Sequence, residues 1–120
     1  MAATTLVVQS HATPLPAAWY EPCIGSVRGW AEAQAFDYRW ISDDLFDRLP
    51  GSLRVRTRTQ PVIASDLARL IVLQEAFEAG YERAVWVEAD VLVMEPSTLI
   101  LPQADALFGR EVWVQEADGG

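Results

Sequence analysis

The sequence predicts an α/β fold, a mainly parallel sheet flanked by helices, in a single domain over residues 1–120. Short apolar runs alternate along the chain with stretches of helical periodicity, which is the order of βαβ units. Only two acids interrupt the apolar run over residues 84–94, a pattern typical of a parallel strand buried on both faces. A length of 120 residues, 51% of them hydrophobic, is enough for one core.

The first third of the chain predicts strand, helix and strand. Residues 6–8 form a short apolar run typical of a strand, which ends at polar residues and then at Pro14 and Pro16. From Glu21 to about Gln34 the spacing of the apolar residues predicts an amphipathic helix. Its apolar positions are Cys23, Ile24, Val27, Trp30 and Ala31. Residues 36–41 alternate apolar and polar side chains, as in a strand with one buried face.

The middle of the chain predicts a short turn, an exposed segment and a second helix. Asp43 or Asp44 can cap a helical turn that Pro50 and Gly51 close. Arginines at every second position then indicate an exposed loop or an edge strand over residues 54–59. The second helix begins near Ser65 and stops at Gly80. Its predicted apolar face carries Leu67, Leu70, Ile71 and Phe77.

The last third predicts strands. The long apolar run over residues 84–94 is the third strand, and residues 106–108 and 112–114 offer two further short ones. The expected order of strand, helix, strand, helix, strand is that of a sheet with parallel neighbours.

Composition and charge exclude several classes of protein. Seventeen acids and nine bases give a net charge of −8, which argues against a nucleic-acid partner, because such proteins concentrate positive charge. No stretch has the roughly 20 consecutive apolar residues of a transmembrane segment. The start of the chain lacks the basic region of a signal peptide, so we expect a cytoplasmic protein. Cys23 is the single cysteine, which excludes an intrachain disulfide and predicts a buried small hydrophobic residue.

Glu88 and Asp90 are the first candidate site residues. They follow the apolar residues 84–87, and ligands of open parallel sheets gather outside the carboxyl ends of the strands. Side chains two apart in an extended segment point the same way, so both carboxylates could bind Mg²⁺ or Mn²⁺. The alternative is a solvated strand end that happens to carry two acids.

Asp66 and Arg69 are the second candidate pair. They lie three residues apart on the second helix and therefore on one face of it. They form either a local ion pair or, if the first turn faces the carboxyl edge of the sheet, a site for sugar hydroxyls and phosphate. The sequence leaves both interpretations open.

Residues 64–70, Ala-Ser-Asp-Leu-Ala-Arg-Leu, are followed about twenty residues later by Trp-Val-Glu-Ala-Asp-Val-Leu-Val over residues 86–93. Together and in this order, these segments resemble the paired motifs of GT-A glycosyltransferases with a DXD-type sugar-binding region. That group includes initiating mannosyltransferases, capsule and lipopolysaccharide sugar transferases, and clostridial glucosylating toxins. The resemblance implies a GT-A, Rossmann-like, nucleotide-sugar-binding fold.

The resemblance also implies roles for individual residues. Asp66 would bind the hydroxyls of the donor's sugar or ribose, and Arg69 would lie near the donor sugar and diphosphate. Asp90 would bind the metal directly, while Glu88 stands where the family usually has aspartate, at the ribose or a metal-bound water. Ser10 lies where the family's nucleotide pocket begins.

The sequence thus predicts a glycosyltransferase that uses Mn²⁺ or Mg²⁺ and a nucleotide-sugar donor. The acceptor would be a sugar, a lipid-linked glycan or a protein. The chain has 30 residues after Asp90, fewer than the family's catalytic domains have, so we expect its N-terminal, donor-binding half. A GT-A-like binding or interaction module without turnover is the alternative. A phosphatase-like hydrolase is a third hypothesis, which Glu88 disfavours because such enzymes use an aspartate nucleophile.

Overall fold

A computed structural model describes residues 3–109 of the chain. Over these residues the fold is α/β, and its elements follow one another in the order strand, helix, strand, three helical segments, strand. The elements are β1 (Thr5–Ser10), α1 (Tyr20–Ala33), β2 (Asp37–Ile41), the 3₁₀ helix η1 (Asp43–Arg48), α2 (Gly51–Thr57), α3 (Pro61–Glu78) and β3 (Arg83–Trp86).

The three strands form one parallel sheet in the order β2-β1-β3. In the central strand, Val7 pairs with Tyr38 of β2 on one side and with Val85 of β3 on the other. The chain therefore leaves β1 through α1 to reach one edge and returns through α3 to the other. This reversal beside the central strand is the topological switch point at which open α/β sheets bind ligands.

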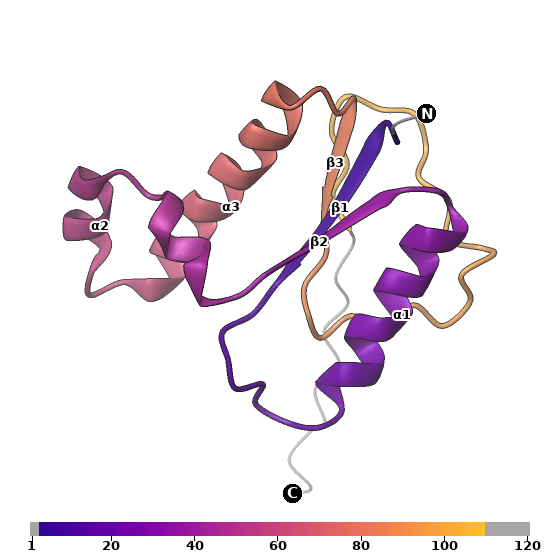
Figure 1. The fold of residues 1–120 in the computed structure, drawn as a ribbon, viewed down its shortest axis with the longest axis horizontal. Helices are drawn as coiled ribbons and strands as arrows, with labels where there is room; N and C mark the ends of the chain where they lie inside the picture. The colour runs from indigo at the N-terminus through magenta and orange to yellow at the C-terminus, as the bar shows by residue number, and fades with distance from the viewer. Residues whose placement is uncertain (1–2, 110–120) are drawn as a thin grey trace, which may run out of the picture.

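Helices cover both faces of the sheet, α1 on one side and α3 on the other (Figure 1). Side chains of β1 alternate between the two layers because successive residues of a strand point to opposite faces. Leu6 and Val8 pack into the core under α3, and Val7 packs with Val27 and Trp30 of α1. The amphipathic helix predicted around Trp30 is confirmed, with Cys23 buried in it.

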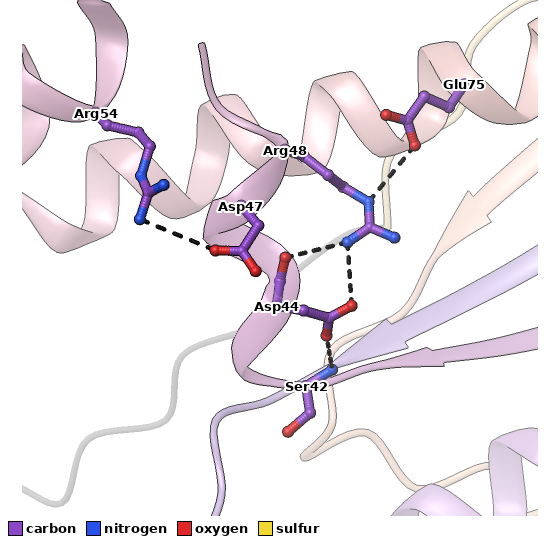
Figure 2. A network of polar contacts seen from close by, with 6 residues as sticks. All are labelled: Ser42, Asp44, Asp47, Arg48, Arg54 and Glu75. Carbon is purple, nitrogen blue, oxygen red and sulfur yellow. Dashed lines mark hydrogen bonds and ion pairs between the residues drawn. The ribbon is translucent and has the colours of Figure 1, made fainter. Parts of the chain in front are cut away.

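A network of ion pairs fastens η1 to the side of α3 (Figure 2). Nη1 of Arg48 contacts Asp44 at 3.4 Å, and its Nε lies 3.5 Å from Glu75 of α3. Asp44 also accepts the backbone N–H of Ser42, 3.1 Å away. The helical turn predicted after Ser42 is confirmed, although neither Asp43 nor Asp44 makes the predicted capping bond.

The prediction for the segment with alternating arginines is confirmed for the exposure of the arginines but wrong for its secondary structure. Arg54 and Arg56 lie in the helix α2 rather than in a loop or an edge strand. Thr57 is buried there, and its hydroxyl donates to the carbonyl of Leu53 one turn earlier. An alternation of two residues over so short a segment does not separate an exposed strand from a short helix that packs on one side.

The second predicted helix exists, and its predicted apolar face is confirmed in part: Leu67 and Ile71 pack against the core, partly buried. Leu70 and Phe77, expected in the core, are more than half exposed, while four smaller residues are turned inward. These inward residues are Ala64, Ala68, Val72 and Ala76. The helix ends at Glu78, and Gly80 follows with a φ of 104°, the left-handed conformation that suits glycine after a helix.

The third strand is shorter than predicted. It ends at Trp86, and its residues are half-buried rather than buried on both faces. Residues 106–108 lie in irregular structure instead of a strand, and the strand predicted over 112–114 lies outside the described residues. Within residues 3–109, no helix combines the length and the apolar character needed to cross a membrane.

Candidate functional site

The carboxyl ends of the three parallel strands meet at one edge of the sheet, where a cavity of about 310 Å³ opens. Residues that follow each strand line it, together with residues of α3 and η1. They are Ser10, His11, Ala12, Ser42, Asp43, Leu45, Phe46, Ser65, Arg69, Trp86 and Glu88. The cavity thus lies at the switch point of the sheet, where a ligand site is expected.

Arg69 is held at this edge by three neighbours. Its Nη2 donates to Oε1 of Glu88 at 2.5 Å, and its guanidinium lies 5.0 Å from the ring centroid of Trp86. Asp66, one turn earlier on α3, has Oδ1 3.8 Å from the same Nη2. The structure therefore brings three of the predicted residues together, and the predicted local ion pair forms as part of this larger cluster.

Trp86 contacts both members of the Arg69–Glu88 ion pair. Its indole Nε1 donates to Oε1 of Glu88 at 3.3 Å, the atom that also accepts from Arg69. A guanidinium over an indole ring gains a cation–π attraction that adds to the ion pair. Arg69 and Glu88 thus neutralise each other beside the Trp86 ring. In this geometry an anion could replace Glu88 as the partner of Arg69, and a cation could replace Arg69 as the partner of Glu88.

The two acids after β3 are not aligned as predicted. Glu88 follows the strand by two residues, but Ala89 and Asp90 form a turn closed by the N–H of Val91 and the carbonyl of Glu88, 3.2 Å apart. The strand pleat that was to place both carboxylates on one side therefore stops before them, and that step of the prediction is wrong. Both carboxylates remain exposed to solvent.

The donor atoms of these acids still suit a hard divalent cation. Over residues 3–109 there is no group of three or more His, Cys, Asp or Glu side chains that could hold a metal by itself. Mg²⁺ and Mn²⁺ are commonly bound by one or two carboxylates together with the phosphates of a substrate, which fits Glu88 and Asp90 better than a cage made of protein alone. Metal binding here stays a prediction.

Ser10 lies where the sequence placed it. It is the last residue of the central strand, it is buried, and it lines the cavity beside His11. The ring of His11 lies edge-on to Tyr20, with the centroids 5.3 Å apart.

Sequence reasoning missed Gln9. This buried glutamine donates from Nε2 to the backbone carbonyl of Glu88 at 3.1 Å and accepts the hydroxyl of Tyr38 at 2.8 Å. One side chain thereby joins the second strand to the acidic turn after the third. The sequence signal for Gln9 is a polar residue directly after the apolar residues 6–8. By itself this position indicates only that the apolar run stops there, not what the side chain contacts.

Asp43 was predicted as a helix cap but closes the rim of the cavity. Its carboxylate accepts both the backbone N–H of Thr13, at 3.1 Å, and the hydroxyl of Thr13, at 2.5 Å. These hydrogen bonds stabilise the charged form and lower the pKa of Asp43. The loop after β1 is therefore fastened to the start of η1.

Comparison with known proteins adds no assignment to this geometry. The chain matches no protein-family model, no curated protein and no solved structure. A function for the chain therefore has to be argued from the residues and contacts at the carboxyl edge.

Proposed function

We propose that this chain binds a nucleoside-diphosphate sugar at the carboxyl edge of its sheet, as a metal-dependent glycosyltransferase or the donor-binding half of one. The observation that carries the proposal is the cavity at the switch point, which gathers Ser10 of β1, Arg69 of α3 and Glu88 of the segment after β3. A GT-A arrangement of the α/β fold would bring together Arg69 and Glu88, one residue from each of the paired motifs, whereas Asp66 and Asp90 do not line the cavity themselves.

Arg69 is the residue proposed to bind the diphosphate. The Arg69 side chain is about one-third exposed, and its present partner Glu88 is half-exposed, so the ion pair between them costs little to exchange. A guanidinium forms paired, charge-assisted hydrogen bonds with phosphate oxygens. Asp66, beside it on α3, is placed to accept hydrogen bonds from the hydroxyls of the sugar or ribose.

Glu88 and Asp90 are the residues proposed to hold Mn²⁺ or Mg²⁺. Glu88 would leave Arg69 for the cation when Arg69 turns to the diphosphate, so that each charge keeps an opposite partner. Held by these residues, such a cation would supply positive charge that stabilises a diphosphate leaving group. Gln9 would keep the backbone of Glu88 in place throughout, through its hydrogen bond to the Glu88 carbonyl.

Thermal unfolding with Mn²⁺, UDP and GDP tests the proposal. A ligand present at about a hundred times its Kd adds about 2.7 kcal/mol to the stability, which raises the Tm of so small a domain by several degrees. We expect this rise with metal and nucleotide together, and its loss in Asp90→Ala and in Arg69→Ala.

Matched controls are available on the same chain. Asp105→Ala removes an exposed carboxylate outside the segment that follows β3 directly, and Arg54→Ala removes an arginine that pairs with Asp47 instead. Both should keep the rise in Tm. Absence of any metal-dependent stabilisation by either nucleotide, or an equal rise in Asp90→Ala, would contradict the proposal. Sugar transfer or donor hydrolysis by the chain would further distinguish an enzyme from a binding module without turnover.

A further inference from the structure

The outer side of α3 carries a row of large apolar side chains that face solvent. Ile63, Leu70 and Phe77 are 46%, 63% and 53% exposed. They are spaced by seven residues, close to two turns of an α-helix, and therefore lie along one line of its surface. We call these three residues the outer stripe.

The opposite side of the helix already packs on the sheet. Ala64, Ala68, Val72 and Ala76 are buried there against Leu6 and Val8 of the central strand. The helix therefore carries apolar residues both toward the sheet and along the outer stripe. This pattern is typical of a helix that packs against a partner on each side. Among the described residues nothing packs over the outer stripe to the extent of burying it.

The stripe is symmetric about its middle residue. Ile63 and Phe77 each stand seven positions from Leu70, so two antiparallel copies of α3 would place Leu70 against Leu70 and Ile63 against Phe77. Asp66 and Gln74, each four positions from Leu70, would face each other in the same arrangement. A twofold interface requires a surface that complements itself in this way.

Charge follows the same symmetry. The exposed Arg56 and Arg58 lie just before the start of α3, and the exposed Glu78 and Glu82 lie at and beyond its end. None of these four forms an ion pair with another of the described residues. Antiparallel pairing brings the basic end of one copy opposite the acidic end of the other, whereas parallel pairing brings like charges together.

We propose that the outer stripe is a homodimer interface, in which α3 packs antiparallel on α3 of a second copy of this chain. The second copy fits because it supplies both the complementary apolar row and the opposite charge at each end. Arg69 of the nucleotide site faces Trp86, whereas Asp66 beside it would border both the nucleotide site and the dimer interface.

Light scattering coupled to size exclusion, over a range of protein concentrations, tests the interface. We expect the natural chain to reach twice its monomer mass and Leu70→Glu to stay monomeric, because two carboxylates would meet on the twofold axis. Met94→Glu is the matched control: Met94 is 83% exposed and lies outside the stripe, so this variant should still dimerise. Circular dichroism checks that both variants are folded.

Charge reversal gives an independent test. One variant carries Arg56→Glu and Arg58→Glu, and the other carries Glu78→Arg and Glu82→Arg. Each alone would oppose like charges at both ends of the interface and should dimerise less than the natural chain, whereas their mixture should form a heterodimer. A natural chain that is monomeric at every concentration, a Leu70→Glu variant that still dimerises, or a mixture no more associated than its components would each overturn the proposal.

Discussion

The two helices that cover the sheet differ in the size of the side chains that they bury. Helix α1 turns its large side chains inward, with Val27 and Trp30 buried under the sheet, and shows Arg28 and Glu32 to solvent. Helix α3 packs alanines on the sheet and shows Leu70 and Phe77 to solvent. The alanines share a core with residues of the sheet and of η1, whereas the large residues Leu70 and Phe77 remain for another contact. We infer that α1 stabilises the fold, whereas α3 also carries the binding surfaces.

The largest expected effect comes from the α1 side. Trp30→Ala removes a buried indole whose Nε1 donates to the carbonyl of Leu99 at 2.9 Å. The change should lower the free energy of unfolding by about 3–5 kcal/mol, which urea denaturation measures. Trp19→Ala, at an exposed tryptophan, is the control and should change stability far less. Equal losses in the two variants would contradict the assignment of the core.

The sheet side of α3 should give the next largest effect. Ala68 is fully buried, and Ala68→Leu forces added volume between helix and sheet, at a cost of about 1–3 kcal/mol. Leu70→Ala on the outer side should stay within about 0.5 kcal/mol when unfolding is measured at concentrations where the chain is monomeric. A larger loss of stability in Leu70→Ala than in Ala68→Leu would contradict this account, because it would mean that Leu70 faces the core.

A smaller effect on stability, but a larger one on binding, is expected at the cavity. Arg69→Ala removes a partly exposed ion pair with Glu88, worth about 0–1 kcal/mol to the fold. It should nevertheless abolish stabilisation by nucleotide and metal, because the guanidinium is the proposed contact to the diphosphate. Thermal unfolding with and without the ligands separates these two effects, and a variant that keeps the full ligand response would remove Arg69 from the site.

The smallest effect is one of pH on the α1 side of the sheet. Burial raises the pKa of Tyr38 above its ordinary value of about 10, because the ionised phenol is harder to desolvate. The stability that Tyr38 contributes is therefore present below pH 10 and is lost as the pH rises through the raised pKa. The free energy of unfolding of Tyr38→Phe should therefore depend less on pH between about pH 9 and 11 than that of the natural chain. Denaturation curves recorded across this range would show the difference.

A control separates Tyr38 from the other tyrosine with a raised pKa. Tyr81 is only partly buried, and its pKa is raised chiefly by the hydrogen bond to Asp37. Tyr81→Phe should leave the alkaline sensitivity that comes from Tyr38 in place. An unchanged alkaline transition in Tyr38→Phe would show that another group causes it.

The same contrast explains how far the sequence predicts the fold. In α1 the large apolar residues recur with helical spacing and face the core, so their pattern gives both the helix and its buried side. In α3 the pattern of large residues gives the helix but only part of its inward side. Leu67 and Ile71 pack against the core as predicted, whereas Leu70 and Phe77 do not. The alanines that fill the rest of that side contribute little to a hydrophobic pattern. The apolar run over residues 84–94 was predicted as one strand, but only its start belongs to the four-residue strand β3. The residues that follow are equally apolar but largely exposed.

The candidate site shows a similar division. The sequence placed Ser10 correctly at the end of its strand and Glu88 correctly after its own, because strand ends follow from where apolar runs stop. It could not place Arg69 against Glu88, since that contact depends on how α3 lies across the sheet. Nor could it find Gln9, whose role depends on two partners far away in the chain, Tyr38 and Glu88.

The most direct test of the donor site uses the indole N–H signals of the tryptophans in the NMR spectrum. Mn²⁺ broadens nearby signals, and the Trp86 indole donates to Glu88, a proposed metal-binding residue, whereas the Trp30 indole lies on the α1 side of the sheet. With UDP or GDP present, a small amount of Mn²⁺ should broaden the Trp86 signal before that of Trp30, and Asp90→Ala should abolish this selectivity. Equal broadening of both signals, or none at Trp86, would contradict a metal-dependent nucleotide site at the carboxyl edge.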